Sequence, residues 1–217
     1  DRQLVDEAAA KQMLAESGIG VPQGAVAAAP SRLAEAAAGL TAPLVLKGLG
    51  HAHKSETGLV RLGLTHDALA GAAPTMSAAK GFLVEELAPP PAGERLVGLG
   101  RDPVYGISLT VGTGGVEAEL LGDVATLILP ASRDEIRAAL AGLRLAPLLT
   151  GYRGRPTADI DAAVTAIQTL CDLIETSPAI DEIDINPLML APCGGGVLAL
   201  DAVIWNTAAR PEEENAS

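Results

Sequence analysis

Two of the three histidines of this chain fall in one short stretch, residues 50–58, which reads GHAHKSETG. His51 and His53 are two residues apart and would share one face of a strand, as a metal-binding pair would. No third ligand follows at a spacing typical of zinc sites. Neutral imidazole can also take up a phosphoryl group, so His53 is a candidate nucleophile toward phosphate. An ordinary exposed loop is the remaining interpretation.

A candidate cation comes just before this stretch. The segment PLVLKGL reads as a buried strand with Lys47 near its carboxyl end. In α/β folds the carboxyl ends of strands border the crevice that holds ligands. A compact ammonium group suits a phosphate oxygen. The alternative is a surface lysine at the end of a strand.

Carboxylates end a later apolar strand, GFLVEEL. Glu85 and Glu86 could accept hydrogen bonds from the exocyclic amine of a heterocycle or from a ribose hydroxyl. Glu94, beyond the proline-rich turn APPPAGE, could do the same. Solvated strand ends are the commoner explanation for such glutamates. The glycine-rich VGTGGVE would let backbone N–H groups approach phosphate, but it lacks the Gly-Lys-Ser/Thr of a P-loop.

A pair of oxygen ligands is expected near the C-terminus. The segments IDEIDINPLMLA and GVLALDAVIW predict a β-hairpin around PCGGG, which brings Asn186 close to Asp201. Asp184 would share the face of Asn186. One carboxylate and one amide oxygen, completed by phosphate oxygens and water, form a typical Mg²⁺ site. Polar residues that satisfy the turn are an equally good interpretation.

Composition limits the classes of function. The 217 residues are 48% hydrophobic and 19% charged, which is typical of a globular chain. The formal net charge of −12 argues against a general nucleic-acid or anionic-membrane binder. Cys171 and Cys193 have no metal-site spacing, so we expect a reducing, cytoplasmic location. No apolar run is long enough to span a membrane, and no signal peptide is visible.

The elements that must position these residues alternate early between strands and helices and then become mostly strands. We expect helices over 5–19, 30–40, 66–79, 131–143 and 157–177. We expect strands over 24–29, 42–49, 59–64, 81–87, 94–102, 105–112, 180–191 and 196–205, with one or two more within 113–129. This order favours two α/β lobes, residues 1–80 and 81–205, with a ligand cleft between them and a polar tail over 206–217.

Taken in order, these stretches resemble the ATP-grasp subunit or domain of ADP-forming acyl-CoA synthetases, which are acid–CoA ligases related to succinyl-CoA synthetase. The resemblance rests on PLVLKGLGHAHKSETGLVRLGL, FLVEEL, ERLVGLGRDPVYG, GTGGVEAELLGDVA and EIDINPLML with GVLALDAVI. These matches extend from about residue 5 to residue 205. The resemblance implies a single ATP-grasp module, of the α/β class, that uses ATP/ADP and Mg²⁺.

It also implies roles in phosphate chemistry. Lys47 would hold the ATP phosphates, and Arg101 would neutralise their charge. Asn186 and Asp201 would bind Mg²⁺. His53 falls where the family has a second phospho-accepting histidine. The stretch at 50–58 would then be part of a phosphate relay.

The nucleotide itself would contact other residues. The resemblance implies that the hinge residues Glu85, Glu86 and Leu87 lie at the adenine and that Glu94 lies near the ribose. The CoA-binding and ligase parts of such an enzyme are absent from these 217 residues, so a partner subunit or domain would carry them and would bind the small carboxylic acid.

Three functions therefore compete. The first is the ATP-binding part of an acid–CoA ligase that forms ADP and phosphate. The second is a non-catalytic regulatory module, as in synthetase-like regions fused to protein acetyltransferases. The third is an ATP-grasp ligase that joins a carboxylate to an amine; the histidine motif disfavours it, because those enzymes need no phosphohistidine.

Overall fold

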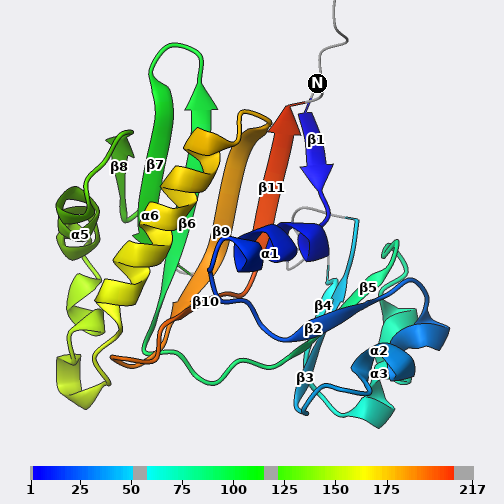
Figure 1. Ribbon diagram of the computed structural model, residues 1–217. Coiled ribbons are helices and arrows are strands. Elements are labelled where there is room, and N and C mark those ends of the chain that lie inside the picture. Colours follow the sequence, from blue (N-terminus) through cyan, green and yellow to red (C-terminus); the bar gives the residue numbers. More distant parts are fainter. Residues whose placement is uncertain (1, 51–57, 115–121, 208–217) are drawn as a thin grey trace, which may run out of the picture.

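A computed structural model describes residues 2–50, 58–114 and 122–207 of the chain. His53 and part of the glycine-rich stretch therefore lie outside the described residues. Two β-sheets of different size organise the molecule (Figure 1). Each has its own cluster of buried aliphatic side chains. The α/β class expected from the sequence is confirmed.

The larger sheet has seven strands. Its main path runs β1 (Arg2–Val5), β11 (Ala202–Thr207), β9 (Ile180–Leu190), β6 (Gly93–Asp102), β7 (Gly106–Thr113) and β8 (Val124–Ile128), with β10 (Val197–Ala199) also paired to β9. Every pairing is antiparallel. Buried residues alternate with more exposed ones along β6, as expected when one face of a sheet is covered by helices.

The smaller sheet has four antiparallel strands in the order β2 (Gly24–Ala27), β5 (Phe82–Glu86), β3 (Leu44–Gly48) and β4 (Val60–Leu64). The central strand β3 is buried along its whole length. Its residues Leu44 and Leu46 pack into the cluster shared with α2 (Leu33–Ala37) and α3 (His66–Ala72). The other face of β3 is free to position Lys47.

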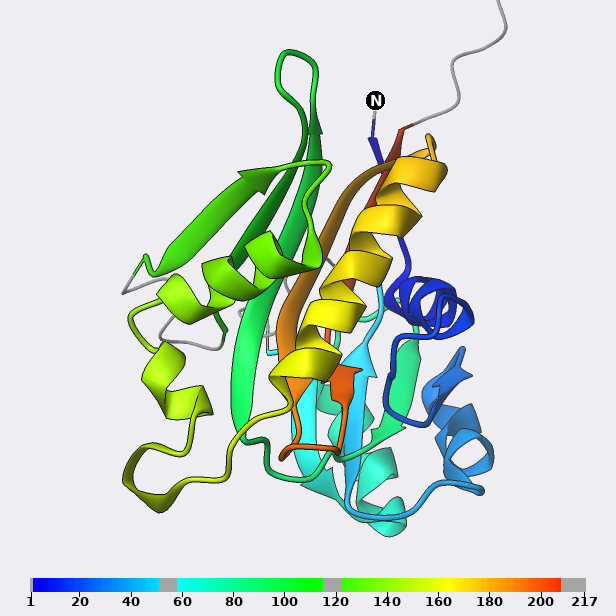
Figure 2. The same ribbon diagram turned by 60° about the vertical axis from the view of Figure 1, so that its left-hand side comes forward.

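Three longer helices accompany the larger sheet: α1 (Glu7–Glu16), α5 (Arg133–Gly142) and α6 (Ile160–Thr176). Figure 2 shows α5 and α6 across one face of that sheet. The buried stripe of α6 includes Ala163, Ile167, Leu170 and Ile174, which recur at helical spacing. No helix in the described part of the chain is long and apolar enough to cross a membrane.

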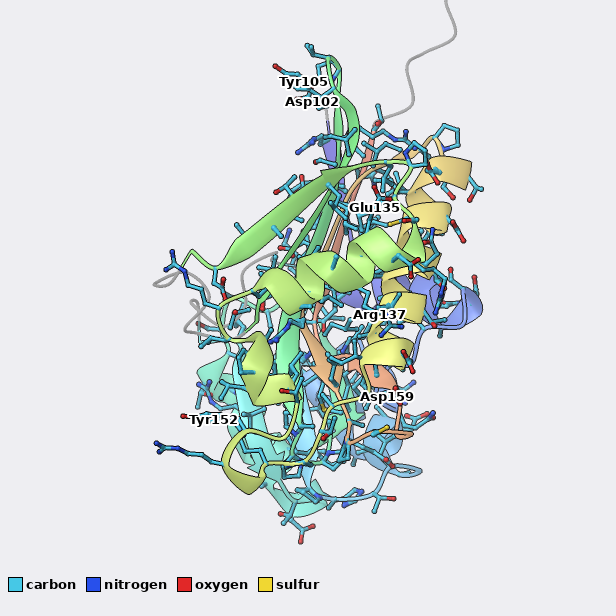
Figure 3. The ribbon with its side chains drawn as sticks, turned by 90° about the vertical axis from the view of Figure 1, so that its left-hand side faces the viewer. Asp102, Tyr105, Glu135, Arg137, Tyr152 and Asp159 are labelled. Carbon is cyan, nitrogen blue, oxygen red and sulfur yellow. The ribbon has the colours of Figure 1, made fainter. Side chains whose placement is uncertain are left out.

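The helix starts follow local sequence. Ser132 and Glu135 form a capping box at the start of α5. Asp159 caps α6 by accepting from the backbone N–H of Ala162. Figure 3 shows Glu135 on α5 and Asp159 at the start of α6. These caps explain why both predicted helices form.

Several expected elements are shorter or divided. The helix expected over 66–79 ends at Ala72 and continues only as a 3₁₀ turn, Ala73–Thr75, because Pro74 cannot extend it. The helix expected over 30–40 divides into a 3₁₀ turn, Pro30–Arg32, and α2. Two further 3₁₀ turns, Ala146–Leu149 and Tyr152–Gly154, lie between α5 and α6. The strand expected over 196–205 is divided into β10 and β11 by Leu200 and Asp201.

The sheets do not follow the expected division at residue 80. Strand β5 pairs with both β2 and β3, so residues 82–86 belong to the smaller sheet and not to the second lobe. Conversely, β1 pairs with β11, and α1 packs into the core of the larger sheet. The chain thus begins on the larger sheet, builds the smaller one and returns through the proline-rich segment 88–92.

We predict that the capping contacts of Asp159 stabilise the folded chain. Its carboxylate also accepts from the backbone N–H groups of Gly194 and Gly196, both at 3.0 Å, so it joins α6 to the β9–β10 turn. Asp159→Ala should lower the free energy of unfolding by about 1–2 kcal/mol in chemical denaturation. Asp172→Ala, on the exposed side of α6, is the matched control and should change it by less than about 0.5 kcal/mol.

The effect should depend on pH in a defined direction. The hydrogen bonds from Gly196 and Ala162 hold the pKa of Asp159 below its ordinary value, against the opposing effect of burial. A carboxyl group with a lowered folded-state pKa contributes stability above its unfolded pKa and loses it as pH falls through its folded pKa. The difference between the parent and Asp159→Ala should therefore be full at neutral pH and shrink below about pH 4. A difference that stays constant to low pH would contradict this role.

Candidate functional site

Lys47 lies on the face of the smaller sheet that turns away from its aliphatic core. In β3 it alternates with Leu44 and Leu46, which are core residues. Its antiparallel partner on β5 is Leu83, and Val45 pairs with Glu85 two residues away. Paired residues share a face, so Lys47 and Glu85 are on the same side of the sheet.

Four buried charges meet on this side. Lys47 Nζ is 2.8 Å from Glu7 Oε1 and 3.1 Å from Glu85 Oε2. Lys11 Nζ is 3.1 Å from Glu7 Oε1 and also donates to Glu85 Oε1. The four residues are 2–7% exposed. We call Glu7, Lys11, Lys47 and Glu85 the charge cluster; it joins α1 of the larger sheet to β3 and β5 of the smaller sheet.

The cluster keeps Lys47 charged. Burial by itself would lower the pKa of Lys47, but the carboxylates of Glu7, Glu85 and Asp201 raise it above its ordinary value. For Lys11, burial and the Lys47 ammonium lower the pKa, and Glu7 and Glu85 oppose the change. Lys47 is thus the firmly protonated cation of the pair.

The predicted oxygen ligands lie against the same cation. Lys47 Nζ donates to the carbonyl oxygen of Leu200 at 2.5 Å, and Asp201 is close enough to raise its pKa. Ile185 pairs with Ala202, and the N–H of Leu200 donates to the carbonyl of Pro187 at 3.1 Å. This register puts residues 186–187 across from residues 200–201. The predicted approach of Asn186 to Asp201 is confirmed.

These two side chains fit a magnesium ion. Among the described residues, no group of three or more His, Cys, Asp or Glu side chains is arranged to hold a metal. A protein cage for zinc or calcium is therefore not found in that part of the chain. One carboxylate and one amide oxygen are, however, what Mg²⁺ takes from a protein when phosphates and water complete its octahedron.

The two hinge glutamates point to opposite sides. Glu85 faces the charge cluster, whereas Glu86 pairs with Leu44 on the other face. The carboxylate of Glu86 accepts from the backbone N–H of Thr41 at 2.8 Å. The N–H of Leu87 donates to the carbonyl of Pro43 at 2.9 Å, and its side chain is exposed. These contacts engage the Glu86 carboxylate and the Leu87 N–H, and the expected adenine contact of the hinge residues stays a prediction.

Glu94 lies on β6 opposite Met189 of β9, on the face away from α5 and α6. It is half-buried, and its backbone carbonyl accepts from the Arg95 guanidinium and from the N–H of Gly114. Its predicted place near a ribose is not tested by these contacts.

Arg101 lies beside the C-terminal end of α6. Its Nε donates to the carbonyl of Ile180 at 2.8 Å, and its Nη2 donates to the carbonyls of Ile174 and Ser177. These carbonyls lie at and just beyond the end of α6. Arg101 is seven residues along β6 from Glu94, next to the hairpin tip where Figure 3 shows Asp102 and Tyr105. The guanidinium therefore satisfies a helix C-terminus in this structure, and its expected phosphate role stays a prediction that these contacts do not support.

Sequence reasoning missed Glu7 and Lys11. A signal for them exists, because residues 7, 10, 11 and 14 of α1 form its buried stripe. Two charged residues of opposite sign at stripe positions, one turn apart, indicate buried charges that need partners on another element. Their partners, Lys47 and Glu85, come from distant parts of the chain and could not be paired with them by spacing.

Comparison with known proteins identifies the family. The chain matches the ATP-grasp domain family over residues 1–205. It is 35% identical over 214 residues to trans-feruloyl-CoA synthase FCS1 of an unknown prokaryotic organism, with 93% of this chain and 30% of that protein aligned. It is 30% identical over 201 residues to subunit beta of the ADP-forming acetate–CoA ligase I of Pyrococcus furiosus, covering 87% of this chain and 86% of that subunit.

Solved structures agree. Dinucleotide-forming acetyl-coenzyme A synthetase 1 of Ca. Korarchaeum cryptofilum, in complex with coenzyme A and Ca-AMPCP, matches with a TM-score of 0.86 at 29% identity over 94% of both chains. A second structure of that enzyme, with Mg-AMPPCP and its phosphohistidine segment pointing towards the nucleotide binding site, matches with a TM-score of 0.79 at 29% identity over 93% of this chain and 92% of that chain. The chain therefore belongs to the ATP-grasp family, and these relatives are acyl-CoA-forming enzymes.

We predict that the charge cluster is stable only when complete. Lys47→Met leaves two buried carboxylates with one ammonium, so it should lower the free energy of unfolding by about 3–5 kcal/mol. Adding Glu7→Gln restores charge balance and should recover part of that loss. Lys80→Met, at an exposed lysine, is the control and should be nearly neutral. A Lys47→Met variant as stable as this control would rule out the cluster.

Arg101 offers a separate test. Arg101→Met should lower the free energy of unfolding by about 1–3 kcal/mol, because three carbonyls lose a charged donor. Its affinity for Mg·ATP, measured by calorimetry at a temperature where the variant is folded, should match the parent. A loss of nucleotide affinity without loss of stability would support the phosphate role.

Proposed function

We propose that this chain is the ATP-binding part of an ADP-forming acid–CoA ligase, which converts an acid, CoA and ATP into acyl-CoA, ADP and phosphate. The chain spans 30% of trans-feruloyl-CoA synthase and most of an acetate–CoA ligase beta subunit, so it corresponds to one module of such enzymes. The observation that carries the proposal is the position of Lys47: a buried, charged ammonium lies against the strand junction that bears Asp201.

Lys47 would bind ATP phosphate oxygens. Its ammonium is already desolvated and oriented, so little reorganisation is needed when phosphate charge arrives. Glu7 and Glu85 hold it in place from two elements. A phosphate oxygen would replace one of these two carboxylates as the acceptor of a Lys47 hydrogen bond, so the ammonium would stay paired before and after ATP binds. The hinge residues Glu85, Glu86 and Leu87 would lie at the adenine, and Glu94 would lie near the ribose.

Asn186 and Asp201 would hold the Mg²⁺ ion that accompanies ATP. When bound, the ion would offset negative charge on the phosphate oxygens. The structural relative with Mg-AMPPCP supports this use of the fold.

His53 would receive the phosphoryl group and pass it toward an acyl-phosphate site on a CoA-binding partner. The support is the sequence resemblance, together with the phosphohistidine segment named for the structural relative. A partner subunit or domain is expected because a relative of this length is a beta subunit. Such an enzyme would act in the cytoplasm, where CoA and ATP are available.

We predict that the chain binds Mg·ATP and that Asp201→Asn weakens the Mg²⁺ dependence. Asparagine keeps the shape of aspartate but removes the negative charge that attracts the ion. Calorimetric titration of ATP at several Mg²⁺ concentrations should show a reduced gain in affinity with Mg²⁺ in this variant. Asp102→Asn, at the distant hairpin tip, is the matched control.

Two results would contradict the assignment. An Asp201→Asn variant with the parental Mg²⁺ dependence would make Asp201 structural. A folded parent chain that does not bind millimolar ATP would favour the non-catalytic regulatory module instead.

We also predict that His53 is phosphorylated during turnover and that His51 and His66 are not. The assay uses the complete enzyme with its partner, supplied with labelled ATP. Acid-labile, base-stable label should appear on this chain and should be lost in His53→Ala but kept in His66→Ala. His66 is a suitable control because its ring contacts the carbonyls of Ala37 and Leu40. Undiminished acyl-CoA synthesis by His53→Ala would reject the relay.

A further inference from the structure

Arg95 presents two buried donors with nothing to bind. It lies on β6 opposite Leu188, on the same face as the core residues Val97 and Leu99, and is 3% exposed. Its Nη1 donates to the carbonyl of Glu94 at 2.7 Å. Its Nε and Nη2 are buried, and neither has a hydrogen-bond partner in the part of the chain that the structure describes. Leaving a charged donor unpaired in the interior costs free energy, so an acceptor that bound this guanidinium would stabilise it.

The two unpartnered nitrogens form one edge of the guanidinium. The N–H bonds of Nε and Nη2 on that edge are parallel, and their spacing matches two oxygens of one carboxylate or phosphate. An oxyanion at this edge would accept both bonds and carry the complementary charge.

Asp123 is the nearby carboxylate, but its acceptors are engaged elsewhere. It accepts from Thr113 Oγ1 at 2.8 Å and from the N–H groups of Arg144 and Leu145 at 2.9 and 3.2 Å. Burial lowers the pKa of Arg95 and the Asp123 charge opposes that change. Asp123 therefore attracts the Arg95 charge but accepts no hydrogen bond from its Nε or Nη2.

Arg95 borders a pocket of about 250 Å³ whose wall is part polar and part apolar, with Glu94 among the lining residues. The wall includes Leu145, Leu148 and Leu149, and Arg155 also lines the pocket. Gly93 allows Leu149 to pack against the backbone, because a Cβ added at Gly93 would lie 2.1 Å from Leu149 Cδ2. The pocket thus places a leucine surface beside the Arg95 side chain, whose paired donor edge is buried.

We propose that this pocket binds a small carboxylate, with its two oxygens on Nε and Nη2 of Arg95 and its short hydrocarbon chain against the leucine wall. Glu94, the proposed ribose contact, also lines this pocket, so the pocket borders the proposed nucleotide site, and its donors come from Arg95 on the helix side of β6. The proposal does not depend on the ligase assignment.

The test is a titration of the 217-residue chain with butyrate at constant ionic strength. Calorimetry measures affinity, and the ¹H–¹⁵N resonance of the arginine Nε–H groups reports the contact. Butyramide serves as the uncharged analogue, and inorganic phosphate as the other oxyanion. Arg95→Met removes the donors, Arg95→Lys keeps the charge without the paired edge, and Arg153→Gln removes an exposed charge outside the pocket wall.

We expect saturable butyrate binding that shifts one Nε–H resonance and falls at least about tenfold in both Arg95 variants, since charged hydrogen bonds are lost. Arg153→Gln should stay within about twofold of the parent. Thermal unfolding verifies that each variant is folded. If Arg95→Met does not fold, the affinity of Arg95→Lys for butyrate provides the test. Three results would overturn the proposal: no saturable binding at about 10 mM butyrate, equal binding of butyramide, or binding of phosphate alone.

Discussion

The junction between the two sheets depends on complete pairing of four buried charges. Desolvating an ammonium or a carboxylate costs several kcal/mol, and that cost is offset only when each charge has partners of the opposite sign. Glu7 and Lys11 come from α1, whereas Lys47 and Glu85 come from β3 and β5. Each side carries one charge of each sign, and the contacts Glu7–Lys47 and Lys11–Glu85 pair these charges across the junction. The cluster therefore couples α1 to the orientation of the smaller sheet.

This constraint has a consequence for ligand binding. A lysine that is buried and paired loses its hydration when the chain folds and not when the ligand arrives. The same contacts direct the ammonium toward Leu200 and Asp201, where strands β10 and β11 meet opposite β9. A phosphate and its Mg²⁺ would then bind where one cation and one carboxylate are already close together. Stability and proposed function use the same residues at this point.

Much of this arrangement could be predicted from the sequence. Apolar runs and turn residues locate most strands and helices, and the hairpin around PCGGG correctly brings Asn186 near Asp201. The resemblance to an ATP-grasp module is confirmed by the family match. The place of Lys47 near the end of a buried strand is a local feature that the apolar run before it reveals.

The failures have a common physical cause, which is that side-chain direction and long-range pairing are not local. Glu85 and Glu86 look equivalent in sequence, but the pleat sends one to the charge cluster and the other to Thr41. The contacts of Arg101 with the end of α6 join residues that are far apart in the sequence. The pairing of β5 with β2 and β3 is long-range and does not follow from the residues of β5, so sequence order alone places this strand in the wrong lobe.

The most direct test of the account is a double-mutant cycle between Lys47 and Asp201, with the affinity for Mg·ATP as the measured quantity. The variants are Lys47→Met, Asp201→Asn and the double variant, all compared where they are folded. The account predicts that each single change weakens binding and that the double variant loses much less than the sum of the two, because both residues serve one phosphate–metal site. Additive losses, or parental affinity in either single variant, would contradict it.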